Sequence, residues 1–376
     1  MVDTPAVLQL CPSLKEGGVE RSTLEMATFL EKQGWKSHIA AHAGPLTQML
    51  PLETTFHPLP LHHRDPFFTI YNAYRIAKLV QKHNISFIHA RSRGPAWSAY
   101  LASKWTGTPY ITTFHSTYGL KGFAKKAYNS VMVKGAHVIA NSQFIKNHIS
   151  ENYGIPADLI PIAPRGYDPH VFSANNISNE ELANLKASMG IMKDVPILLL
   201  VGRISRKKGQ KILLEALTHL KDLPWVALFA GGADKKQTFL AELQNFCQTH
   251  NIEDRVHWLG SRTDVAKLYA LADIAISPST EPEAFGRVAV EAQAMKTPII
   301  ATNHGGSLET VQDGITGWLI PPDNPEILAK TIRKALTDTK RLSTMGDEAY
   351  RWVSEHFTTE MTCQKEFAEY QHIIKK

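Results

Sequence analysis

Short apolar runs alternate with longer amphipathic segments along the first half of the chain. The segments 22–34, "STLEMATFLEKQG", and 96–107, "AWSAYLASKWTG", repeat their apolar residues with the period of a helix. The apolar runs have the length of buried strands, and this alternation predicts a parallel sheet covered by helices on both faces. The predicted strands of this half span residues 6–12, 36–42, 85–90, 109–115, 136–141 and 159–164.

The same alternation restarts after a polar stretch at residues 168–195. We therefore expect an α/β protein with two doubly wound, Rossmann-like domains, in which ligands bind beyond the carboxyl ends of the strands, in a cleft between the domains. The predicted strands of the second half span residues 196–203, 225–232, 256–260, 274–279 and 298–302. The predicted divisions are a first domain over 1–170, a linker over 171–195, a second domain over 196–350, and a C-terminal helix over 351–376 for which a return to the first domain is one option.

Length and composition agree with this organisation. A chain of 376 residues exceeds one ordinary hydrophobic core, so two domains are expected. Cys11, Cys247 and Cys363 are too far apart for a disulfide framework or a metal-binding spacing, which is typical of a reducing compartment. The N-terminus lacks the basic region of a signal peptide, and no run approaches the roughly 18 apolar residues of a spanning helix. We expect a cytoplasmic protein.

Charge is distributed unevenly between the two halves. Residues 1–172 hold 17 Lys and Arg against 10 Asp and Glu, whereas the remainder is nearly neutral. A basic half indicates an anionic partner such as a phospholipid, a phosphorylated sugar or a nucleic acid. No nucleic-acid-binding signature accompanies the charge, so no nucleic acid partner is expected.

Two regions of the basic half are candidates for contact with such a partner. Arg91 and Arg93 follow a predicted strand, where they would meet a phosphorylated or acidic sugar. The segment 120–135 mixes lysines with apolar residues, which favours either an anionic membrane surface or a helix packed on its own domain with solvated lysines.

Candidate phosphate-binding residues occur in both halves. Arg203 and Lys208 follow a predicted buried strand and are flanked by glycines, a placement that suits contact with phosphate oxygens. Gly17 and Gly18 lie between the first strand and the first helix, where the backbone can approach an anion closely. A solvated basic loop and a plain structural turn explain these residues equally well at this point.

The segment "EPEAFGRVAVEA", residues 281–292, contributes two carboxylates. Glu283 is expected in the loop before a helix and Glu291 about one turn inside that helix. A carboxylate accepts hydrogen bonds from a vicinal diol, so this pair suits the two ends of a sugar nucleotide whose diphosphate is held by cations. Glutamates of a surface helix are the alternative.

Seven segments occur together and in one order along nearly the whole chain. On these segments the chain resembles the retaining glycosyltransferases of family 4, which have the two-domain GT-B fold. The segments are "GGVER", "TTFHSTYG", "VIANSQFIKNHI", "PRGYDPHVF", "VGRISRKKG", "EPEAFGRVAVEA" and "GGSLETVQDGITGWLIPPD".

The resemblance implies a role for each charged candidate of the second half. Glu283 would contact hydroxyls of the donor sugar, and Glu291 would contact the ribose of the nucleotide. Arg203 and Lys208 would bind the diphosphate and stabilise it as the leaving group. Transfer would keep the anomeric configuration through a front-face reaction, from a UDP- or GDP-sugar. No acidic metal cage is evident in the sequence, so we expect that transfer requires no metal ion or other cofactor.

Backbone positions complete the implied donor site. The N–H groups around Phe285 and Gly286 would support the donor, and Gly305 with Gly306 would shape its pocket. From the first half, Gly17 and Gly18 would approach the same phosphates.

Two residues of the first half, His115 and Arg165, are further candidates for contact with the substrates. His115, at the end of a predicted strand, would point toward the transferred sugar; a structural hydrogen bond is its alternative. Arg165 stands where many relatives carry Asn, so it would bind phosphate of either substrate or pair with Asp168.

The arginine version of this motif, and the segment "HARSRGPAWSAYLASKWTG", resemble lipopolysaccharide-core glycosyltransferases. The resemblance therefore implies a glycolipid or lipopolysaccharide-precursor acceptor and a peripheral position on the inner face of the cytoplasmic membrane. Two other functions are considered: a nucleotide-sugar epimerase of similar architecture, which needs no acceptor, and a non-catalytic protein that binds anionic lipid.

Overall fold

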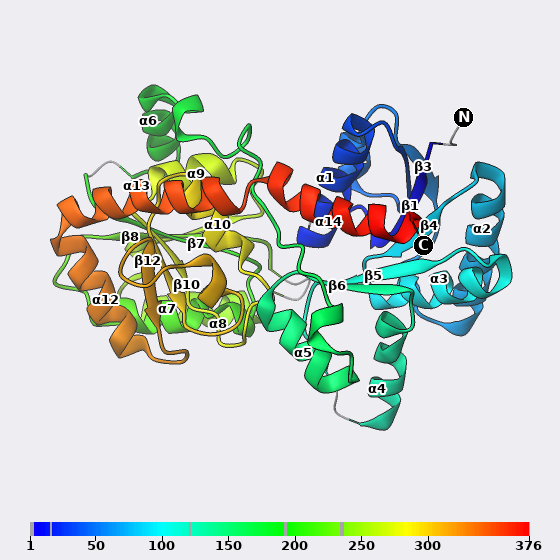
Figure 1. Cartoon of the computed structure of the whole chain (residues 1–376). Helices are drawn as coiled ribbons and strands as arrows, with labels where there is room; N and C mark the ends of the chain where they lie inside the picture. Colours follow the sequence, from blue (N-terminus) through cyan, green and yellow to red (C-terminus); the bar gives the residue numbers. More distant parts are fainter. Residues whose placement is uncertain (1–3, 16, 120–121, 192–193, 234–236, 376) are drawn as a thin grey trace. The chain divides into compact units, whose positions relative to one another are not determined.

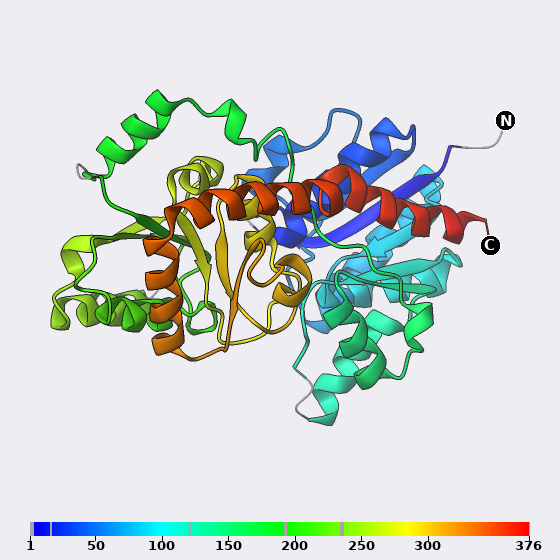
Figure 2. The ribbon, with the colours of Figure 1, turned by 60° about the vertical axis from the view of Figure 1, so that its left-hand side comes forward.

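The computed structural model describes residues 4–15, 17–119, 122–191, 194–233 and 237–375, and these form two compact α/β units (Figure 1). Unit 1 comprises Met1–Arg165 and Thr359–Lys376, and unit 2 comprises Gly166–Thr358. In Figures 1 and 2 the strands of each unit form a single layer that is flanked by helices.

Unit 1 contains a six-stranded parallel sheet with the strand order β3-β2-β1-β4-β5-β6. The central strands are buried on both faces, which explains why they read as continuous apolar runs rather than as alternating patterns. The strands are β1 (Ala6–Ser13), β2 (Lys36–His42), β3 (Thr55–Pro58), β4 (Phe87–Ala90), β5 (Tyr110–Phe114) and β6 (His137–Ala140).

The helices of unit 1 include one from the far end of the chain. Helix α14 packs beside α1, with Phe367 in edge contact with Phe29 at 5.5 Å and with Trp35 at 4.8 Å between ring centroids. Its Tyr370 is completely buried in the same core. The helices are α1 (Gly18–Lys32), α2 (Pro66–His83), α3 (Arg93–Thr106), α4 (Phe123–Asn129), α5 (Gln143–Tyr153) and α14 (Thr359–Ile374).

Unit 2 repeats this design with the strand order β12-β11-β10-β7-β8-β9, again all parallel. Its strands are β7 (Ile197–Val201), β8 (Val226–Ala230), β9 (Val256–Gly260), β10 (Ile274–Ser277), β11 (Ile299–Thr302) and β12 (Gly317–Ile320). Its helices are α6 (Asn179–Ser188), α7 (Gln210–Thr218), α8 (Thr238–Thr249), α9 (Val265–Leu271), α10 (Arg287–Ala294), α11 (Ser307–Thr310), α12 (Pro325–Thr337) and α13 (Thr339–His356).

The expected α/β architecture of two doubly wound Rossmann-like domains is confirmed. The structure groups residues 171–195 with unit 2, because α6 packs against α9. The segment 159–164, which we expected as a strand, makes only an isolated bridge between Ile162 and Ala140. In the part of the chain that the structure describes, no helix combines the length and the apolar character that a membrane span requires.

Candidate active site

The carboxyl ends of three adjacent strands in unit 2 bring the predicted donor residues together. Strands β7, β10 and β11 are neighbours in the sheet, so the loops that follow them share one edge. Arg203 and Lys208 follow β7, Glu283 follows β10, and Gly305 follows β11. Residues separated by about a hundred positions in the sequence therefore meet at this edge.

An ion pair between Lys208 and Glu283 forms the centre of this edge. The Lys208 Nζ atom lies 2.6 Å from Glu283 Oε1, and both side chains are about a quarter exposed, at 27% and 22%. The Ser279 hydroxyl donates to the same oxygen at 2.6 Å. Burial alone would raise the pKa of Glu283, but Lys208 and Ser279 together hold it below its ordinary value, so the carboxylate is ionised at neutral pH.

Sequence reasoning missed Ser279, which orients Glu283 from four residues upstream. Its carbonyl oxygen accepts hydrogen bonds from Thr302 Oγ1 at 3.0 Å and from the His304 ring at 2.9 Å, so the end of β10 is fixed by the loop after β11. A lone serine beyond a strand carries no pattern that distinguishes it, and only the fold reveals its contact.

Arg203 differs from the other cations of its loop. Its side chain is exposed, and among the described residues it has no hydrogen-bond or ion-pair partner. Arg206 instead pairs with Glu242 at 2.6 Å, and Lys207 pairs with Glu281 on the surface. Arg203 is thus available to bind an anion beside the Lys208–Glu283 pair.

Two glycines let the loop that carries Glu283 lie directly against the loop after β11. The backbone N–H of Gly306 donates to the Glu283 carbonyl at 2.8 Å. Gly305 has φ +62°, and a Cβ at either glycine would overlap the backbone of Glu283 or Phe285. Glycine is required here both for the left-handed conformation and for the close approach.

Helix α10 begins at Arg287, so Glu283 lies in the loop before it and Glu291 lies inside it, as predicted. Gly286 has φ +88° and precedes the helix, and Glu291 lies about one turn inside it. Glu291 is buried and accepts a hydrogen bond from Arg287 Nε at 2.9 Å. The Phe285 side chain is also buried, in edge contact with Phe357 at 5.6 Å, so only its backbone is placed for ligand contact.

The candidates of unit 1 also lie at strand ends. Gly17 and Gly18 follow β1 and open helix α1, where a Cβ at Gly17 would overlap the carboxylate of Glu20. His115 follows β5, and its ring lies 3.3 and 3.4 Å from Arg165 Nη2, measured to its two nitrogens. Because β1, β4 and β5 are neighbours, these residues share the carboxyl edge of the unit 1 sheet.

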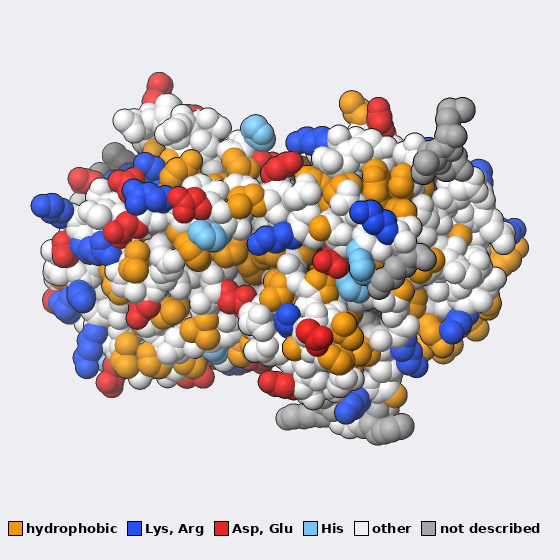
Figure 3. Space-filling view, viewed as in Figure 1, with side chains coloured by type: hydrophobic (Ala, Val, Ile, Leu, Met, Phe, Trp, Pro, Cys, Tyr) orange, Lys and Arg blue, Asp and Glu red, His pale blue; other side chains and the backbone are white. Residues whose placement is uncertain are grey.

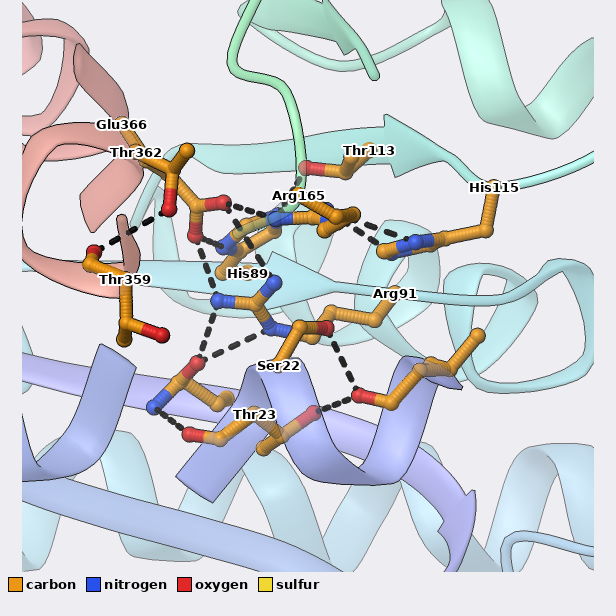
Figure 4. A network of polar contacts seen from close by, with 12 residues as sticks. Ser22, Thr23, His89, Arg91, Thr113, His115, Arg165, Thr359, Thr362 and Glu366 are labelled. Carbon is orange, nitrogen blue, oxygen red and sulfur yellow. Dashed lines mark hydrogen bonds and ion pairs between the residues drawn. The ribbon is translucent and has the colours of Figure 1, made fainter. Parts of the chain in front are cut away.

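A buried carboxylate on α14 holds two arginines beneath this edge (Figure 4). Glu366 accepts from Arg165 Nη1 at 3.0 Å and also pairs with Arg91. The Arg91 guanidinium donates further to Gln9 Oε1 at 2.9 Å, and the Tyr370 hydroxyl donates to Glu366 at 2.8 Å. Figure 4 shows Arg165 lying between this network and His115.

The charges of this network determine the protonation of its histidines. Burial would raise the pKa of Glu366, but Arg91 and Arg165 hold it well below its ordinary value. Burial and the neighbouring guanidiniums lower the pKa of His89 and of His115 well below the ordinary value. His115 is therefore a neutral ring at neutral pH, with one nitrogen able to accept from Arg165 and the other able to donate.

The expectation for Arg91 is wrong, and one of the alternatives for Arg165 is excluded. Arg91 is completely buried and bound by Glu366, so it cannot meet an acceptor sugar. Arg165 does not pair with Asp168, whose carboxylate instead accepts from the backbone of His170 at 2.9 Å. Arg93 is partly exposed, donates to Asn129 at 2.9 Å, and lies over the Tyr118 ring at 4.3 Å.

The lysine-rich segment 120–135 is described from residue 122 onward, so Lys121 lies outside the described residues. Lys125 and Lys126 are exposed on α4.

In the described parts of the chain, no group of three His, Cys, Asp or Glu side chains is arranged to hold a metal ion.

Comparison with known families follows the two units. Residues 16–171 match the model described as Glycosyltransferase Family 4, and residues 183–352 match Glycosyl transferases group 1. The crystal structure of a glycosyltransferase from Rickettsia africae is 36% identical, with a TM-score of 0.91 and full coverage of both chains. The Anabaena protein HepE in complex with UDP-glucose is 24% identical, with a TM-score of 0.86, and covers 98% of this chain and 99% of its own.

Curated relatives are similar over different shares of the chain. An uncharacterized glycosyltransferase of Methanocaldococcus jannaschii is 29% identical over 61% of this chain and 60% of its own length. A lipopolysaccharide 1,2-N-acetylglucosaminetransferase of Salmonella typhimurium is 30% identical over 61% and 60%. A D-inositol 3-phosphate glycosyltransferase of Paenarthrobacter aurescens is 27% identical over 90% and 85%. The alignment thus spans about three fifths of the first of these relatives.

Proposed function

The chain belongs to the glycosyltransferases, with a family 4 domain followed by a group 1 domain, and from this premise we propose that it transfers a sugar from a nucleoside-diphosphate sugar to a hydroxyl of a glycolipid. Family membership confirms the expectation of a glycosyltransferase of GT-B fold. The observation that supports the donor class is the ionised Glu283, paired with Lys208 beside the exposed and unpartnered Arg203.

When the donor binds, Lys208 is proposed to exchange its partner Glu283 for the diphosphate of the donor. A diphosphate carries the charge that Lys208 and Arg203 can both contact, so Lys208 would turn from Glu283 to the phosphate oxygens. Glu283, still held by Ser279, would then accept hydrogen bonds from hydroxyls of the sugar. Glu291 would contact the ribose, and the glycine-rich backbone at Phe285, Gly286 and Gly305 would leave room for the donor.

The proposed chemistry is a retaining, front-face transfer in which the leaving diphosphate helps to deprotonate the acceptor hydroxyl. As the glycosidic bond breaks, negative charge develops on the diphosphate, where Arg203 and Lys208 stabilise it. These cations supply the charge that a metal ion provides in other transferases, so we propose that transfer needs neither a metal nor another cofactor. Loss of the protein's transferase activity in EDTA and its recovery with Mg²⁺ would contradict the proposed independence from metal ions.

His115 is proposed to donate a hydrogen bond to the transferred sugar. The Arg165 guanidinium, 3.3 Å from Nδ1 and 3.4 Å from Nε2, disfavours the charged form, and the neutral ring keeps one N–H to donate. Glu366 fixes Arg165 for this purpose. Gly17 and Gly18, at the start of α1, would contribute backbone N–H groups to the phosphates.

The donor base and the acceptor are proposed from the relatives. HepE was crystallised with UDP-glucose, which makes a UDP-sugar the first donor to test before GDP-sugars. The Salmonella relative acts in lipopolysaccharide synthesis, which supports a lipopolysaccharide precursor as the acceptor, and the basic first half suits phosphorylated glycolipids at the inner face of the cytoplasmic membrane. Because the Paenarthrobacter relative is named a D-inositol 3-phosphate glycosyltransferase, D-inositol 3-phosphate is the second acceptor to test beside a lipopolysaccharide precursor.

The test is turnover of a panel of UDP- and GDP-sugars without acceptor, followed by release of free nucleoside diphosphate. We expect slow hydrolysis of one donor, lost in Glu283→Ala and retained in Glu281→Ala, whose glutamate lies two residues away and pairs with Lys207 on the surface. Epimerised free sugar nucleotide would instead support the epimerase reading. Equal activity in both variants would remove Glu283 from the donor site.

A further inference from the structure

The outward face of helix α2 in unit 1 is unusually apolar. Phe67 is 72% exposed, Ile70 56%, Tyr71 38% and Tyr74 51%. The spacing of these four residues, three and four apart, places them in one stripe along the helix. In Figure 1 this helix lies beside α3 at the border of unit 1, and Figure 3 shows apolar and basic side chains mixed along that border.

This stripe is additional to the face that α2 buries. The helix packs on its unit through Asn72, Ala73, Ile76, Ala77 and Val80, all buried. The exposed aromatic residues therefore contribute nothing to the core, and leaving them in water costs free energy that a partner would recover. Scattered apolar residues on a surface are ordinary, whereas a continuous stripe of four large ones indicates a contact surface.

Basic residues continue the same face. Arg75, Lys78 and Lys82 are exposed, and helix α2 itself contains no acidic residue. The Lys78 ammonium lies 4.6 Å from the centre of the Tyr74 ring, and the Arg75 guanidinium lies 5.8 Å from that of Tyr71. Cations and aromatic rings thus share one surface, as in helices that lie in the interface of a membrane.

The neighbouring helix α3 carries the same combination at its C-terminal end. Trp105 is 51% exposed, and Lys104 beside it is exposed as well. Tryptophan is enriched where a protein meets the headgroup region of a bilayer, because its ring is apolar at one end and polar at the other.

We propose that the outward face of α2 docks on an anionic phospholipid surface. Phe67, Ile70 and Tyr74 enter the boundary between headgroups and acyl chains, and the long side chains of Arg75 and Lys78 reach the lipid phosphates. A second copy of the chain fits this face less well, because self-association would bring the cations of two α2 helices together. The proposal does not depend on the sugar that is transferred, since it concerns a surface and no donor residue.

The test is co-sedimentation of the full chain with phosphatidylglycerol–phosphatidylethanolamine vesicles and with phosphatidylcholine vesicles at physiological salt. We expect binding to the anionic vesicles that exceeds binding to phosphatidylcholine and falls as salt rises. The variants Ile70→Ser with Tyr74→Ser, and Arg75→Gln with Lys78→Gln, should each weaken binding about tenfold or more. Leu52→Ser, which changes a fully exposed apolar residue outside α2, should have no effect.

Because all of these side chains are exposed, the variants should keep the melting temperature and the donor hydrolysis of the parent, so a loss of lipid binding reports on the surface alone. The proposal is overturned if no anionic vesicle is bound. It is also overturned if binding survives the α2 variants and is lost in Lys125→Gln with Lys126→Gln, which would assign it to α4. A dimer in lipid-free sedimentation that the α2 variants dissociate would identify a second copy as the occupant instead.

Discussion

The four cations of the loop after β7 show how strongly the role of a residue depends on its partner. Arg206 and Lys207 are as basic as their neighbours, but each is neutralised by a surface glutamate. Lys208 faces Glu283 at the strand ends, and the Arg203 side chain has no hydrogen-bond or ion-pair partner among the described residues. The four residues cannot be told apart by their charge alone. Their ion pairs distinguish the two surface cations from the two at the proposed donor site.

Arg203→Ala should lower turnover about 10²-fold or more, because a positioned cation at the developing charge of the leaving diphosphate is lost. Arg206→Ala, three residues away in the same loop, should leave turnover nearly unchanged. The measurement is kcat and KM with the donor identified by the panel. Similar rates for the two variants would show that Arg203 has no special role.

Glu366→Ala should destabilise unit 1 by about 3–5 kcal/mol, because two buried guanidiniums would lose their only carboxylate partner in the network. The matched control is Glu369→Ala on the same helix, which removes a partly exposed partner of His137 and should cost about 1 kcal/mol or less. Urea unfolding of both variants measures the difference. Comparable losses would mean that the buried network adds little to stability.

At the scale of elements, the donor edge depends on two loops that touch through glycine. Gly305→Ala should disrupt the loop that carries Glu283, since the position is left-handed and a Cβ would overlap the Glu283 backbone. We expect donor hydrolysis to be lost. The control Gly314→Ala, with φ +72° and open space around it, should cost only about 1 kcal/mol and keep the activity. An active Gly305→Ala enzyme would contradict the close approach.

A histidine contact between β2 and β3 makes unit 1 sensitive to acid. His38 Nδ1 lies 3.1 Å from His57 Nε2, and burial together with neighbouring cations lowers the pKa of both rings to about 4. Because unfolded histidine titrates near pH 6.5, the unfolded chain binds more protons between pH ~6.5 and ~4, so stability is complete above this window and falls as pH drops through it.

Melting temperatures from pH 7 to pH 5 test this expectation. The parent should lose several degrees over this range, and His57→Gln should lose less, since it removes one of the two groups that resist protonation. The other buried histidines contribute to both proteins and cancel in the comparison. Parallel curves for parent and variant would show that the pair does not titrate in this range.

The central strands, which are buried on both faces, are among the elements that sequence patterns predict. The run "ILLLV" of β7 is apolar throughout because helices cover both sides of a central parallel strand. The edge strands β3 and β12 are not among the predicted strands, because "TFHP" has no apolar run and "GWLI" directly follows the polar, glycine-containing segment "QDGIT". Segment 159–164 has such a run without forming a strand.

In the whole molecule, the repetition of one α/β architecture in both halves could be predicted from the sequence. Contacts between residues that lie far apart in the sequence could not. Glu366 lies 275 residues from Arg91, and no spacing rule connects a glutamate of the last helix with an arginine after β4. The return of α14 to unit 1 creates this contact, so Arg91 is structural rather than ligand-binding. Family motifs identified Glu283, Lys208 and Arg203 because those residues belong to continuous segments.

Lys208, Glu283 and Arg203 are proposed to form one site for a nucleoside-diphosphate sugar. Calorimetric titration of UDP and GDP into the parent chain, Lys208→Gln and Lys207→Gln is the test of this site. One nucleotide should bind the parent and Lys207→Gln with similar affinity, and Lys208→Gln about tenfold or more weakly, because one charge-assisted phosphate contact is lost. Equal affinities of the two variants, or no binding of either nucleotide to the parent, would contradict the proposed site.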